Sequence, residues 1–112
     1  RDTGIALALE TKELLYDAIS GQRTWLLRVD PDFSIPWEVH TSAEEGFLIA
    51  GDFRVGECLP EGPVVGGYLP GGYFYRPAGR VHSGPSSGSD QGALWVLRTP
   101  TELTVEFLDS CE

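Results

Sequence analysis

The fold is decided by residues 35–51, which read IPWEVHTSAEEGFLIAG. Glu38 and His40 are two residues apart, so their side chains project from one face if this segment is extended. Two consecutive glutamates follow, and then an apolar stretch that ends in a glycine turn at Gly51. We therefore expect two short strands joined by a turn that carries carboxylates.

An apolar period of two continues along the chain from Arg23 onward. It is clearest in residues 25–29, 94–97 and 103–107, where apolar side chains alternate with their neighbours. Glycine and proline interrupt these segments at short intervals, with 14 glycines and 8 prolines in 112 residues. Short strands separated by regular turns predict an all-β barrel or sandwich.

Two segments do not follow this pattern clearly. Residues 5–19 are rich in helix-forming residues, but Ile5, Leu7 and Leu9 alternate as in a strand, and we expect strands there. Residues 83–92 read SGPSSGSDQG. This polar composition predicts a mobile loop beside the mouth of the barrel.

Length and charge limit the classes of function. The 112 residues predict a single domain, residues 1–112. Eight basic against 17 acidic residues give a net charge of −9, which makes nucleic acid and anionic membranes poor partners. No apolar run approaches the roughly 18 residues of a membrane-spanning helix. The chain has no methionine, which indicates a processed or excised piece.

Cys58 and Cys111 are the two cysteines, 53 positions apart. Their spacing fits neither a zinc knuckle nor a disulfide framework. We expect two unpaired, reduced thiols and a cytoplasmic location.

The chain has two histidines, and each has a distinctive context. His40 lies in the segment quoted first. His82 ends residues 71–82, GGYFYRPAGRVH, in which an aromatic strand and a Pro-x-Gly turn precede the imidazole. One metal site supplied by two hairpins would explain this arrangement.

At these residues the sequence resembles the cupin superfamily. The first cupin motif is matched by His40, Glu44 and Gly51, and the second by Gly71, Pro77, Gly79 and His82. Three positions depart from the pattern: Glu38 replaces the first histidine, Asp32 the leading glycine and Ser86 the closing asparagine. The match covers residues 25–98, and RPAGRVHSGP followed by GALWVLR is similar to ChrR-type cupins.

The resemblance implies a small antiparallel double-stranded β-helix, the jelly-roll barrel of cupins. It also implies a divalent transition metal, such as Zn, Fe(II), Mn or Ni, with Glu38, His40, Glu44 and His82 as ligands. Glu45 is the alternative to Glu44, because Glu45 has the strand parity of the apolar Phe47. The six-residue interval to the closing glycine favours Glu44.

The resemblance leads us to expect a metal-dependent enzyme of oxygenase, isomerase or hydrolase type that acts on a small organic molecule. Glu38 or Glu45 is the candidate catalytic base. The candidate substrate-binding residues are Trp37, Tyr75, Arg76, Arg80 and Trp95. The alternative is a non-enzymatic metal- or ligand-sensing module that regulates a partner protein, and a closed metal site would favour it. We also expect a homodimer that pairs through residues 5–9 or 103–108.

Overall fold

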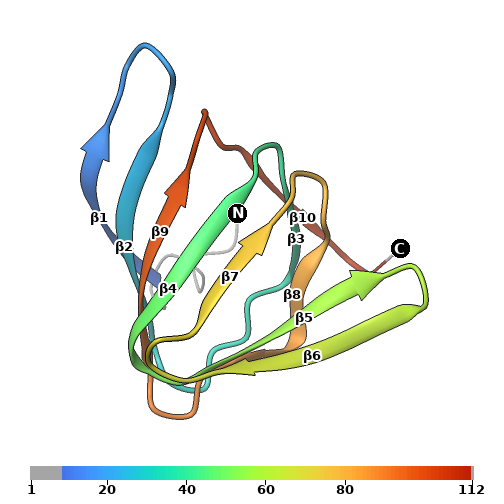
Figure 1. Ribbon diagram of the computed structural model, residues 1–112. Helices are drawn as coiled ribbons and strands as arrows, with labels where there is room; N and C mark the ends of the chain where they lie inside the picture. Colours follow the sequence, from blue (N-terminus) through green and yellow to red (C-terminus); the bar gives the residue numbers. More distant parts are fainter. Residues whose placement is uncertain (1–8, 112) are drawn as a thin grey trace.

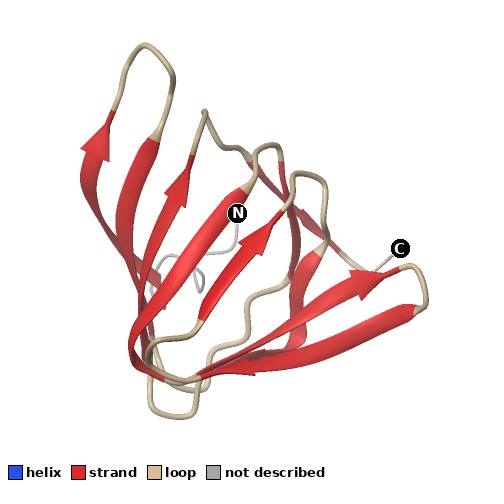
Figure 2. Ribbon diagram, viewed as in Figure 1, coloured by secondary structure: helices blue, strands red, loops and turns tan. Residues whose placement is uncertain are grey.

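The computed structural model describes residues 9–111, which fold into two five-stranded antiparallel sheets (Figures 1 and 2). The first sheet has the order β1 (Leu9–Tyr16), β2 (Arg23–Val29), β9 (Ala93–Thr99), β4 (Glu44–Gly51) and β7 (Tyr73–Arg76). The second has the order β10 (Val105–Leu108), β3 (Trp37–His40), β8 (His82–Gly88), β5 (Phe53–Leu59) and β6 (Gly62–Tyr68). The expected all-β barrel is confirmed.

The two sheets face each other like the sides of a V, which meet at the lower left of Figure 1 and diverge above. Apart from the β1–β2 and β5–β6 hairpins, consecutive strands lie in opposite sheets. The chain therefore passes repeatedly from one sheet to the other, as in a double-stranded β-helix. Among the described residues, no helix has the length and apolarity required to cross a membrane.

The core lies between the inner faces of the sheets. Trp95 is its centre, with ring centroids 5.6 Å from Phe53, 5.5 Å from Tyr68 and 5.3 Å from Phe74, all in edge-to-face geometry. Edge-to-face aromatic pairs contribute about 1 kcal/mol each beyond the apolar area they bury. The alternation of residues 25–29 and 94–97 has the expected consequence: Trp25, Trp95 and Leu97 are buried.

Gly51, the last residue of β4, occupies a position at which a larger residue would not fit. Its φ is +88°, a conformation that residues with a side chain rarely adopt, and an added Cβ would strike the carbonyl group of Gly92. The β4–β5 turn and the β8–β9 turn can therefore lie against each other. This close approach fixes where the chain passes from the first sheet to the second.

The expectation for residues 5–19 is confirmed where it can be assessed. Leu9–Tyr16 is strand β1, paired with β2 along its length, and a turn follows. Residues 5–8 lie outside the described residues.

The expectation of a mobile loop over residues 83–92 is wrong for residues 83–88, and a turn follows at residues 89–92. His82–Gly88 is strand β8, which lies between β3 and β5 in the second sheet. Ser83 and Ser87 are buried, and the Ser87 hydroxyl accepts from the Ile35 amide at 2.9 Å and donates to the Gly84 carbonyl at 2.7 Å. Small hydroxyl side chains with partners can occupy a sheet interior, so the polar composition does not indicate a loop here.

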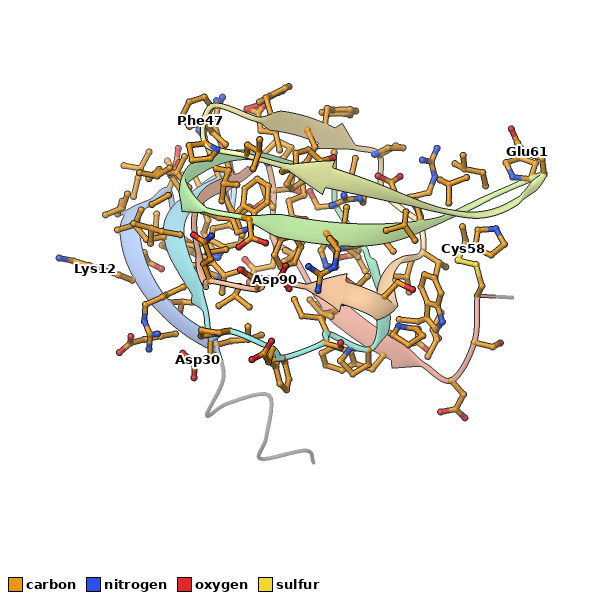
Figure 3. The ribbon with its side chains drawn as sticks, turned by 90° about the horizontal axis from the view of Figure 1, so that it is seen from below. Lys12, Asp30, Phe47, Cys58, Glu61 and Asp90 are labelled. Atoms are coloured by element: carbon orange, nitrogen blue, oxygen red, sulfur yellow. A yellow bond between two sulfur atoms is a disulfide. The ribbon has the colours of Figure 1, made fainter. Side chains whose placement is uncertain are left out.

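The expectation of free thiols is also wrong. Cys58 on β5 and Cys111 form a disulfide, with Cα atoms 5.7 Å apart (Figure 3). The chain after β10 returns to the end of β5, a long-range approach that cysteine spacing cannot reveal (Figure 1). Disulfides persist mainly in oxidising compartments, so this bond does not favour the predicted cytoplasmic location.

Candidate metal centre

Glu38, His40 and His82 meet on the inner face of the second sheet. Glu38 and His40 are two residues apart on β3, and His82 on β8 is the cross-strand partner of Glu38. Glu38 Oε1 lies 3.2 Å from His40 Nε2, and Glu38 Oε2 lies 3.4 Å from His82 Nε2. The imidazoles are perpendicular with centroids 4.6 Å apart. One ligand atom from each residue lies within 4.8 Å of the others, a spacing that could hold a metal ion.

This triad is buried, and its charges are stabilised by its own members. Burial alone would raise the pKa of Glu38, but hydrogen bonds with His40, His82 and Ser83 lower it to about 2. Burial would lower the pKa of His40, but the hydrogen bond with Glu38 and the charges of Glu44 and Glu38 raise it. Glu38 is thus ionised, and His40 holds a proton readily. Binding of a metal ion would displace that proton.

Ser83 holds the second oxygen of Glu38. Its hydroxyl donates to Glu38 Oε2 at 2.7 Å. Ser83 adopts a φ of 80°, which is uncommon for a residue with a side chain. The register of β8 against β5 shifts at this point, since Ser83 pairs with Gly56 but Gly88 pairs with Arg54. Such irregularities re-aim side chains and are frequent at functional sites.

Each imidazole contacts an acceptor through its other nitrogen. His82 Nδ1 lies 3.1 Å from the backbone carbonyl oxygen of Arg80. His40 Nδ1 lies 3.4 Å from Glu44 Oε1. When a metal ion displaces the proton on Nε2, an acceptor at Nδ1 holds the remaining proton, an arrangement common around metal-binding histidines.

Glu44 belongs to the opposite sheet, where Arg76 is its cross-strand partner. Arg76 Nη1 lies 3.6 Å from Glu44 Oε1, and Nη2 lies 3.3 Å from Glu57 Oε2. Arg80 also contacts Glu57, at 2.9 Å. Burial raises the pKa of Glu44, opposed by the charges of His40, His82 and Arg76. A continuous polar network therefore links the two sheets beside the triad.

The triad forms one wall of a hollow of about 160 Å³ between the sheets. Most of the remaining wall is apolar, with Trp25, Phe53, Phe74, Trp95 and Leu97 facing the triad. The two histidine segments thus deliver both imidazoles to one space, as the sequence indicated. The expectation that each segment is a hairpin is wrong, because β3 and β4, like β7 and β8, lie in opposite sheets.

The family model of the ChrR Cupin-like domain matches residues 3–101. The chain belongs to this cupin family. No curated protein matches the cupin. Its motif spacings are therefore those of a family member, and the resemblance noted in the sequence is confirmed.

Solved structures of cupin enzymes share the fold. The DMSP lyase DddQ from Ruegeria pomeroyi superposes with a TM-score of 0.78 at 15% identity, over 96% of this chain and 55% of the lyase. A variant of Bacillus subtilis oxalate decarboxylase gives 0.69 at 21% identity, over 82% of this chain and 25% of that chain. A structure of oxalate oxidase superposes with a TM-score of 0.72 at 16% identity, over 96% of this chain and 59% of that chain. The cupin thus spans a quarter to about three fifths of these proteins.

The structure brings most of the predicted metal ligands together. Glu38, His40 and His82 form the triad, and Glu44 contacts the ring nitrogen of His40 that faces away from Glu38. Glu45 is not brought to the site: it contacts Arg98 at 3.3 Å and accepts a hydrogen bond from the Tyr73 hydroxyl at 2.7 Å. Adjacent strand residues point to opposite faces, so only one glutamate of this pair can face the interior.

Of the predicted substrate-binding residues, some line the hollow and others lie away from it. Arg76 and Trp95 line the hollow. Trp37 alternates with the inward-facing Glu38 and lies close to Gly84 and Gly56 instead. Tyr75 is 62% exposed, and Arg80 is held by Glu57. Neither lines the hollow.

Two residues of the network are absent from the sequence-based site. Ser83 holds Glu38, and Glu57 holds Arg76 and Arg80. Glu57 could have been found, because it shares strand parity with the apolar Phe53 and Val55 and is therefore directed inward. Nothing in the sequence signals the register shift that directs Ser83.

Proposed function

We propose that this cupin is a metal-dependent enzyme that acts on a small organic molecule in the hollow. The convergence of Glu38, His40 and His82 on one wall of an accessible interior space carries the proposal. Two imidazoles and one carboxylate with open positions are the donor set of non-haem Fe(II) oxygenases, and a similar set binds catalytic zinc. The same donors also suit Mn and Ni.

In this proposal the three triad residues hold the metal ion. A bound divalent ion would polarise a substrate oxygen or activate water or dioxygen. Glu44 and the Arg80 carbonyl orient the two imidazoles through their Nδ1 atoms. Ser83 fixes the carboxylate of Glu38. Of the two predicted bases, Glu38 faces the hollow but serves here as a ligand with a lowered pKa, and Glu45 lies on the outer face.

Three protein ligands leave positions on the metal open toward the hollow. Open positions are typical of catalytic centres, whereas structural sites are closed by four protein ligands. This difference supports an enzyme over the alternative of a sensing module. A site closed by Glu44 as fourth ligand would support the module instead.

Metal content tests the proposal. The purified chain, reconstituted without oxygen at neutral pH and passed through a desalting column, should hold about one equivalent of Fe(II), Mn, Zn or Ni by elemental analysis. His82→Ala should hold less than a tenth of an equivalent, because two ligands rarely retain an ion. Glu45→Gln is the matched control on the outer face and should bind as the unchanged protein does. A metal content below a tenth of an equivalent in the unchanged protein would refute the site.

We also propose a homodimer. Strand β10 is an edge of the second sheet, with β3 as its partner on one side. Exposed strand edges favour pairing between copies. Light scattering on the purified chain should give twice the mass of 12.2 kDa, and a mass of one chain at micromolar concentration would contradict the dimer.

A further inference from the structure

The size of the hollow limits the substrate, provided that the proposed metal enzyme is correct. Its volume of about 160 Å³ is close to that of an engineered apolar cavity of about 150 Å³ that binds benzene. A single ring, or a branched molecule of similar size, would fill it. Much larger molecules would have to extend out through the mouth.

The polar groups that line this space lie together, at and around the triad. The triad lies on the second sheet, and Arg76 and Glu44 lie opposite it, while the side chains deeper between the sheets are apolar. Edge-to-face contacts hold Phe53, Tyr68 and Phe74 around Trp95. A ligand without an apolar body would leave these walls unfilled.

Arg76 supplies a second constraint. The residue is 4% exposed, its Nη atoms face Glu44 and Glu57, and its Nε has no hydrogen-bond partner among the described residues. The Nε atom is shielded from the hollow, but other atoms of Arg76 line it, so an oxygen atom of the ligand can accept a hydrogen bond from an Nη atom.

The charges oppose a dianionic ligand. Arg76 is the one cationic side chain among the lining residues, apart from the imidazoles, and it already faces two carboxylates. Glu38 and Glu44 add negative charge to the same space. With a divalent ion bound, the ion and Arg76 carry +3 and the two glutamates −2, so one further negative charge neutralises the lining and a second exceeds it.

The mouth is apolar as well. Val105 and Phe107 on β10 are the cross-strand partners of His40 and Glu38, so all four side chains share the inner face. Both apolar residues line the hollow, yet Val105 is 43% and Phe107 42% exposed. Exposed apolar side chains beside a buried polar triad form an entrance that selects apolar molecules.

We propose that the site takes a compact molecule with a single-ring-sized apolar body and one oxygen-bearing head group, neutral or singly charged, such as a ketone or a phenol. The head group lies between the triad and the Arg76 guanidinium, and the body packs against the Trp95 cluster. Phe107 and Val105 set the specificity at the mouth.

Calorimetric titration of the zinc-loaded chain with phenol, cyclohexanone and glycerol tests this class of ligand. Phenol and cyclohexanone should bind at least tenfold more tightly than glycerol, which carries oxygen atoms but no apolar body. Phe107→Ala should weaken binding of phenol about fivefold, while Phe47→Ala, equally exposed but on the opposite face of its sheet, should not change it. Tighter binding of glycerol, or equal effects of the two phenylalanine variants, would overturn the proposal. Circular dichroism should show that both variants are folded.

Failure of the metal site can be told apart from failure of this inference. The titrations are repeated with His82→Ala and with the metal-free chain. Weakened but measurable phenol binding, still sensitive to Phe107→Ala, supports the apolar specificity whether or not the metal proposal holds. Binding of phenol that ignores Phe107 in every form of the protein refutes the inference and leaves the metal site unaffected.

Discussion

β2 and β9 pair without interruption over seven residues, Arg23–Val29, whereas β3 and β8 pair at Glu38 and His82 alone. The β2–β9 pair is thus a regular ladder that presents apolar side chains to the interior, although β1–β2 and β4–β9 in the same sheet each contain one register shift. The second sheet contains the register shift beside Ser83 and presents the polar triad. The comparison indicates that the regular β2–β9 pair supports the fold, whereas the interrupted β3–β8 pair holds the chemistry.

The largest effect is expected on the apolar wall. Trp95→Ala should lower the free energy of unfolding by about 4 kcal/mol, because it removes a buried side chain that contacts three other aromatic rings. Urea denaturation measures the change. Tyr75→Ala, on an exposed side chain, is the control and should shift stability by less than about 0.5 kcal/mol. A loss below about 1 kcal/mol for Trp95→Ala would mean that the regular β2–β9 pair does not carry the stability.

The next effect concerns the disulfide that supports the second sheet through Cys58 on β5. The double variant Cys58→Ser, Cys111→Ser should lose about 3 kcal/mol, because the disulfide closes a loop between residues 53 positions apart. Cys58 alternates with the inward-facing Glu57, so the metal content should not change. A reductant should destabilise the unchanged protein by the same amount and leave the double variant unaffected. Equal stability in urea with and without reductant would contradict this support.

The smallest expected effect concerns Glu44, which lies on the first sheet and contacts His40 on the second. Glu44→Gln keeps an oxygen acceptor near His40 Nδ1 but removes the charge, and it should weaken metal binding about tenfold. Competition with a chromophoric chelator measures the affinity. The adjacent Glu45→Gln lies on the outer face and should leave the affinity unchanged. Complete loss of the metal in Glu44→Gln would make Glu44 a ligand and close the site.

The sequence predicted the triad because strand parity and turn spacing are local properties. Glu38 and His40 are two positions apart, so both lie on one face of their strand. The Pro-x-Gly turn places His82 at the start of its strand. The disulfide and β8 depend on contacts between distant segments. Ser87 is ordered by Ile35, and Cys58 by a partner near the C-terminus. Local composition carries no information about either contact.

An anomalous-scattering map from crystals of the metal-loaded chain tests the central claim most directly. The account predicts one peak bound by a Glu38 oxygen, His40 Nε2 and His82 Nε2 at about 2.0–2.2 Å, with Glu44 outside the coordination sphere. A peak elsewhere, or one that does not contact His82, would contradict the account.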